Sequence, residues 1–64
     1  MPRFKFERNK NGKTSTEELS FGNSNIAQDF ARDWLIKDLE LQEVVITQID
    51  PKDPLHGRVT IDRL

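Results

Sequence analysis

A β-hairpin is predicted by residues 3–21, which read RFKFERNKNGKTSTEELSF. Phe4 and Phe6 alternate with charged residues, and this period of two places both rings on one face of a strand. Asn11-Gly12 is typical of the tight turn that joins two antiparallel strands, because both residues tolerate a positive φ angle. A second strand is expected over residues 14–21, so the first third of the chain folds back on itself.

A single helix is expected after this hairpin. Residues 26–41 contain no Gly or Pro, and either Ser24 or Asn25 can cap the first turn; Asn25 with Gln28 forms a variant of the capping box. Apolar residues recur at helical spacing and define one face for the core. This face comprises Ile26, Ala27, Phe30, Ala31, Trp34 and Leu41.

Two further strands are expected after the helix. The β-branched run within residues 43–50 is typical of a central strand with apolar side chains on both faces. Pro51 and Pro54 must leave the sheet because proline has no N–H to donate, and residues 58–64 then alternate again. The predicted fold is α+β in the order β-β-α-β-β, with one helix on one face of a four-stranded, mostly antiparallel sheet. Residues 1–64 make a single domain.

The size and composition of the chain limit its class. A chain of 64 residues buries a small core, and its lack of cysteine excludes disulfides and cysteine-based zinc sites. Oligomerisation is the remaining common source of stability. No apolar run approaches the roughly 18 residues of a membrane span, and a cytoplasmic protein is expected.

Charge is unevenly distributed along the chain. Residues 1–13 hold five basic residues and one acidic residue, a net charge of +4, whereas residues 14–64 hold five basic and ten acidic residues, a net charge of -5. This asymmetry indicates either an anionic partner or complementarity between copies of the chain. Alternatively, the basic residues protect a solvent-facing strand from aggregation.

Self-association is the leading functional hypothesis. Whichever of the pairs Val44/Ile46 and Val45/Ile49 faces the helix, the other makes an apolar stripe on the far side of the sheet, and this stripe is suited to a homodimer interface. Pairing of the last strand with a copy across its open edge is the alternative. Ile36 and Leu39 lie outside the core face of the helix, as a contact patch or under a loop.

Nucleic-acid binding is the second hypothesis. The candidate phosphate contacts are Arg3, Lys5, Arg8, Lys10 and Lys13. Base stacking on Phe4 and Phe6 is not expected, because the alternation places the two rings on one face and the basic residues on the other. The chain would then be a nucleic-acid-associated accessory protein.

Groups suited to catalysis or cofactor binding are few. Asp50, Asp53 and His56 could converge on a divalent metal, although Asp beside Pro more often caps the local backbone. Glu17 and Glu18 are adjacent on a strand, so they point to opposite faces and cannot act as a pair. We therefore expect no enzyme activity, no metal and no cofactor.

The opening and closing residues, together with the first turn and the single amphipathic helix, carry a resemblance that covers nearly the whole chain in pattern but few residues in identity. The opening Met1-Pro2-Arg3-Phe4-x-Phe6 and the closing Gly57-Arg58-Val59 are similar to small bacterial domains of unknown function that begin Met-Pro-Arg-aromatic and share the β-β-α-β-β order. The first turn of those domains is commonly acidic, whereas residues 9–13 are basic here. The resemblance implies a fold and no activity.

Overall fold

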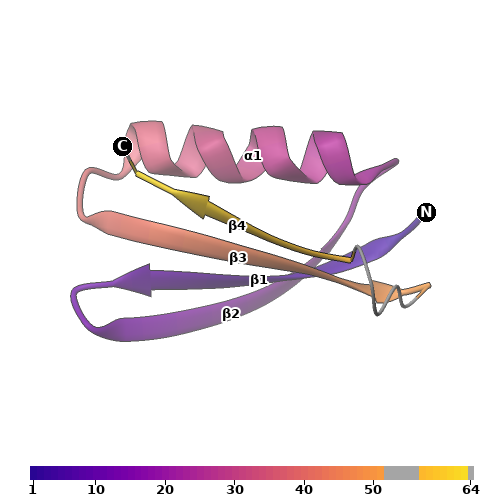
Figure 1. The fold of residues 1–64 in the computed structure, drawn as a ribbon, viewed down its shortest axis with the longest axis horizontal. Coiled ribbons are helices and arrows are strands. Elements are labelled where there is room, and N and C mark those ends of the chain that lie inside the picture. Colours follow the sequence, from indigo (N-terminus) through magenta and orange to yellow (C-terminus); the bar gives the residue numbers. More distant parts are fainter. Residues whose placement is uncertain (52–56, 64) are drawn as a thin grey trace.

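The fold is one antiparallel sheet covered by one helix. The computed structural model describes residues 1–51 and 57–63. The elements are β1 (Arg3–Lys10), β2 (Lys13–Ser20), α1 (Ser24–Lys37), β3 (Leu41–Asp50) and β4 (Arg58–Asp62). The strands lie in the order β2-β1-β3-β4, and each neighbouring pair is antiparallel. α1 lies along one side of the sheet (Figure 1), which confirms the predicted α+β fold.

The turn between β1 and β2 has the predicted geometry. Asn11 and Gly12 have φ angles of 52° and 78°, and Lys10 pairs with Lys13 on either side of them. Both positive angles match the right-handed twist of the flanking strands. β1 also pairs with β3, so the first strand of the chain is an inner strand of the sheet.

The helix begins one or two residues earlier than predicted. Its N-cap is Asn23, whose Oδ1 accepts a hydrogen bond from the backbone N–H of Ile26 at 3.0 Å. The expectation of Ser24 or Asn25 as the cap was therefore wrong. Gln28 does not complete a capping box and instead donates its side-chain amide to Ser24 Oγ at 3.0 Å.

The helix also ends earlier than predicted, at Lys37 instead of about Leu41. The cause is Asp38, whose Oδ1 accepts a hydrogen bond from the N–H of Glu40 at 3.1 Å and turns the chain towards β3. Leu41 therefore belongs to β3, where it is buried, and Leu39 lies in the turn.

In the described part of the chain, no helix is long and apolar enough to span a membrane.

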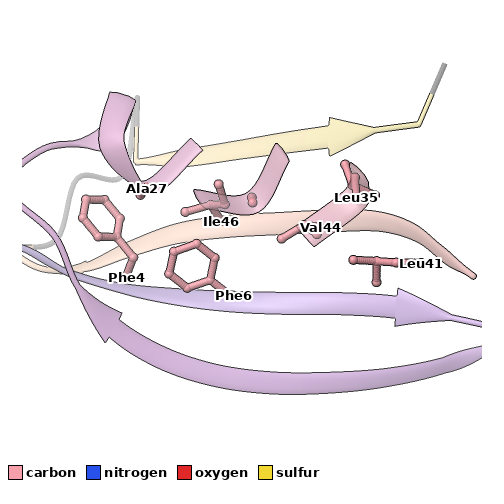
Figure 2. Packing of buried hydrophobic residues seen from close by; sticks show 8 residues of the cluster. Phe4, Phe6, Ala27, Leu35, Leu41, Val44 and Ile46 are labelled. Carbon is pink, nitrogen blue, oxygen red and sulfur yellow. The ribbon is translucent and has the colours of Figure 1, made fainter. Parts of the chain in front are cut away.

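The core lies between α1 and the two inner strands, β1 and β3. Phe4 and Phe6 come from β1, and Val44 and Ile46 come from β3 (Figure 2). Their helical partners are Ala27, Ala31 and Leu35, which follow one another at intervals of four residues. The small alanine side chains allow the helix to approach the sheet closely.

This row of residues rotates the helix relative to the predicted core face. Ile26 is 48% exposed and Phe30 is 36% exposed, whereas Leu35, absent from that face, is buried. Phe30 and Trp34 lie beside the row and pack on Phe6 with ring centroids 6.2 and 5.3 Å away. The five aromatic residues of the chain form one continuous cluster, namely Phe4, Phe6, Phe21, Phe30 and Trp34.

Candidate interaction surface

The basic residues of the first hairpin have acidic neighbours inside the molecule. Arg3 contacts Glu18 at 2.5 Å, and Lys5 lies 3.7 Å from Glu7. Both pairs are on the face of the sheet opposite α1. Because they are exposed, each contributes little to stability. Each of these two cations, which phosphate binding would require, therefore already has a carboxylate beside it.

Arg8 and Lys10 point to the other face of the sheet, which corrects the expectation that all the basic residues lie opposite the phenylalanines. The guanidinium of Arg8 lies over the ring of Trp34, 4.6 Å from its centroid. One of its nitrogens contacts Glu17 at 3.3 Å. The guanidinium of Arg8 is therefore stacked on an aromatic ring and paired with a carboxylate, while its buried Nε has no hydrogen-bond partner among the described residues.

Lys10 holds the turn that follows the helix. Its Nζ lies 2.9 Å from Asp38 Oδ2 and 3.7 Å from Glu40. The hydrogen bond and attraction between Lys10 and Asp38 raise the pKa of Lys10 and lower the pKa of the Asp38 carboxyl. Lys13, the last of the five candidate phosphate contacts, is exposed at the start of β2.

A groove of about 300 Å³ separates the end of α1 from the first hairpin. The charged side chains that line this groove form ion pairs. These pairs are Arg8 with Glu17, Lys10 with Asp38, and Lys37 with Asp33 at 2.8 Å. The lining residues are Arg8, Lys10, Ser15, Trp34, Lys37, Asp38 and Leu41.

No cluster of three metal-ligating side chains occurs among the described residues. Of the metal candidates suggested by the sequence, Asp50 is exposed at the end of β3. Asp53 and His56 lie outside the described residues.

The candidate interface on the outer face of the sheet is mostly enclosed. Val44 and Ile46 belong to the core under α1, so they line no surface and leave the candidate interface. Val45 points outward but is only 7% exposed, because it lies directly between Glu7 of β1 and Thr60 of β4. Ile49 is half-buried. The expected apolar stripe is therefore much smaller than the β-branched run suggests.

The open edge beside β4 is the more accessible apolar surface. Ile36 on α1 is 73% exposed, and α1 packs against β3 and β4. A groove of about 360 Å³ runs between the helix and this edge. Its lining residues are Arg32, Leu35, Ile36, Ile61, Asp62 and Arg63. Leu39, 81% exposed, is not among them, so Ile36 and Leu39 do not form one helical patch.

The backbone of β4 has N–H and C=O groups on its outer side that pair with no other strand in the described part of the chain. The carbonyl of Gly57 accepts from Gln48 N–H, and the N–H of Arg63 donates to the carbonyl of Gln42. Backbone bonding in antiparallel strands alternates from residue to residue, so the odd-numbered residues of this segment face β3. The N–H and C=O groups of the even-numbered residues Arg58, Thr60 and Asp62 therefore face outward.

The other edge of the sheet has a different character. β2 is exposed along its length except at Leu19, which is half-buried. Its remaining side chains are polar on both faces. The β4 edge therefore combines free backbone groups with apolar side chains, whereas the β2 edge is polar.

The sequence predicts the last strand as a possible site of pairing, but it does not predict the groove beside this strand. Leu35 is absent from the predicted core face, because that face is centred on Trp34, whereas the buried row is centred on Ala31. The spacing of Ala27, Ala31 and Leu35 is the signal that would have identified Leu35 as a core residue.

Comparisons with protein-family models, curated proteins and solved structures found no match to this chain.

Proposed function

We propose that this chain is a small, non-catalytic interaction domain that self-associates through the open edge of β4. The observation that carries the proposal is the exposed Ile36 beside the outer edge of β4, which pairs with no other strand among residues 1–51 and 57–63. Burial of an isoleucine side chain contributes roughly 1.5–3 kcal/mol, and a second copy provides both apolar cover and backbone partners. A small core gains the most from such an addition.

A non-catalytic role is supported by the groove beside Trp34. The carboxylate that lines this groove is Asp38. One of its oxygens accepts a hydrogen bond from Lys10 and the other accepts one from the backbone N–H of Glu40, so both oxygens already stabilise the turn after α1. A cytoplasmic location is part of the same proposal, because a chain without cysteine has no need of an oxidising compartment.

The test of self-association is the mass in solution. At about 10 µM, a concentration at which dimers of ordinary affinity persist, sedimentation equilibrium should give twice the monomer mass of 7.5 kDa. Ile36→Glu should weaken the dimer by roughly tenfold or more, because it places a charge in the apolar groove.

Ile26→Glu is the matched control for this variant. Ile26 is also an exposed isoleucine of α1, but it lies near Gly22 at the other end of the helix, outside the groove. It should leave the mass unchanged. A wild-type protein that stays monomeric to millimolar concentration contradicts the proposal, and equal effects of the two variants contradict the choice of surface.

The alternative function, contact with nucleic-acid phosphates through the first hairpin, is less well supported. Arg3, Lys5, Arg8 and Lys10 each have a carboxylate within 4 Å. Phosphate binding would have to displace these partners. Retention of the protein on DNA or RNA that falls steeply with salt, and that is lost in a Lys5→Glu/Arg8→Glu/Lys10→Glu variant, would favour this alternative.

A further inference from the structure

We propose that the second copy binds in one defined register, with β4 antiparallel to its own counterpart and Thr60 on the two-fold axis. This inference rests on the proposed function and specifies the partner strand and its alignment. It begins from the backbone. Arg58, Thr60 and Asp62 present their N–H and C=O groups to the open edge, so an added strand must bond to these three residues.

The sequence of β4 is complementary to itself in this alignment. Residues 58–62 read Arg-Val-Thr-Ile-Asp. When two copies run antiparallel about Thr60, Arg58 of each copy lies opposite Asp62 of the other, and Val59 lies opposite Ile61. Both charge pairs are attractive, and both apolar pairs lie on the helix side of the sheet. About six backbone hydrogen bonds join the strands.

Other registers lose this complementarity. Outward-facing residues must pair with outward-facing residues, so the next permitted alignments shift by two positions. Either shift places Thr60 opposite one of the two charged residues and separates Arg58 from Asp62. The alignment centred on Thr60 is the one that satisfies every charged group of the strand.

The environment of Asp62 provides an independent reason for a cation at this position. Within one copy, Asp62 lies directly opposite Glu43 of β3. This is a non-hydrogen-bonded position, where opposing side chains are closest, and two carboxylates in such a pair repel each other. Arg58 of the second copy would lie on the free side of Asp62 and offset this repulsion.

The two-fold axis of such a dimer is perpendicular to the sheet. The eight strands form one continuous sheet, and both helices lie on the same face of it. The open side of the groove beside Ile36 then faces the same groove of the second copy. The proposed register thus brings together the two features of this edge, its free backbone groups and its exposed isoleucine.

Charge reversal tests the register. Arg58→Asp alone and Asp62→Arg alone each replace two attractive pairs by two repulsive ones because of the symmetry. Each should raise the dimer dissociation constant by about tenfold or more. Arg58→Asp/Asp62→Arg restores opposite charges and should return the constant to within about threefold of wild type. Circular dichroism of each variant verifies the fold.

Mixing the two single variants gives a sharper result. One variant then carries carboxylates at both positions, and the other carries guanidinium groups at both, so the two proteins complement each other. An equimolar mixture should form a heterodimer at a concentration where each variant alone is monomeric. Failure to do so while the wild type is dimeric overturns the register.

A spin label locates the axis. The chain contains no cysteine, so Thr60→Cys gives a single labelling site. Two labels on opposing residues, about 5.5 Å apart between Cα atoms, should broaden the electron paramagnetic resonance spectrum strongly. Thr14→Cys on β2 is the control and should show no broadening. A dimer without broadening at position 60 overturns the register but leaves self-association intact, whereas a monomeric wild type overturns both.

Discussion

Phe6 shows how much one side chain contributes to this small core. It has no exposed surface, and its ring meets those of Phe21, Phe30 and Trp34 at centroid distances of 5.7, 6.2 and 5.3 Å. All three contacts have steeply inclined rings, the arrangement in which an edge meets a face favourably. Phe6 therefore connects the hairpin to the helix.

Truncation of Phe6 and of Phe30 should distinguish a residue at the centre of the core from one at its edge. Phe6→Ala should lower the free energy of unfolding by about 3–5 kcal/mol, enough to unfold much of a domain of this size. Phe30→Ala should cost less than half as much, because its ring is partly in water. Urea denaturation followed by circular dichroism measures both. Equal losses would contradict the observed rotation of the helix.

Phe4 and Phe6 could be assigned to the core from sequence because alternation is a local pattern. Ile26, Phe30 and Leu35 could not be placed correctly by the same reasoning. Seven of the 14 residues of α1 are apolar, and which of them lie at the centre of the core depends on where the alanines permit close packing. Val45 lies on the outer face of the sheet and is nevertheless buried, because Glu7 and Thr60 flank it on the neighbouring strands.

At the level of elements, the end of α1 depends on residues remote in sequence. Arg63, which follows β4, donates hydrogen bonds to the backbone carbonyls of Leu35, of Asp38 at 2.7 Å and of Leu41 at 3.0 Å. A guanidinium at the carboxyl end of a helix satisfies free carbonyls and interacts favourably with the helix dipole. Lys10 holds the same turn from the opposite side.

Loss of this cap should destabilise the helix end. Arg63→Ala should lower the free energy of unfolding by about 1 kcal/mol, and Arg63→Lys should recover part of it because a single ammonium group cannot reach all three carbonyls. Hydrogen exchange at the amides of residues 34–38 measures the effect. Unchanged protection there would contradict a capping role.

The pair of Lys10 and Asp38 should make stability depend on pH in two ranges. The pKa of Asp38 is lowered in the folded state, so its contribution is present above the unfolded pKa of about 3.8 and is lost as pH falls through the folded value. The pKa of Lys10 is raised, so its contribution is present below about 10.5 and is lost as pH rises through the folded value.

Asp38→Asn tests this dependence. The variant should flatten the acid-side fall in melting temperature relative to wild type, because the lowered carboxyl no longer titrates. Thermal melts between pH 2 and pH 5 measure it, with Asp29→Asn as a control on the exposed face of α1. Parallel acid-side curves for Asp38→Asn and wild type would contradict the role of this pair.

The hairpin and the element order were predictable because their signals are adjacent in sequence. The end of the helix was not, since no Gly or Pro marks it and the turn at Asp38 is held only in part by its local hydrogen bond to Glu40 N–H. Asp38 is also held by Lys10 of β1 and by Arg63, which follows β4, and both are remote in sequence. The placement of β1 inside the sheet also depends on non-local pairing, which alternation alone does not specify.

At the level of the whole molecule, folding and self-association should be coupled. A partner that binds the folded state raises the melting temperature with protein concentration. Between about 1 and 100 µM the wild type should gain roughly 5 °C or more, whereas Arg58→Asp should show little change. Differential scanning calorimetry at the two concentrations measures the shift. A wild-type melting temperature independent of concentration would contradict the coupling.

The polar character of β2 has a consequence for how far assembly can proceed. Once two copies share β4, the outermost strands of the enlarged sheet are both β2, whose solvent-facing residues include Thr14, Thr16, Glu17 and Glu18. Charged, polar strands at the rim discourage further addition of strands. The β4 edge thus binds one partner, whereas the polar β2 edge disfavours the addition of further copies. The expected product is a closed dimer and not a filament.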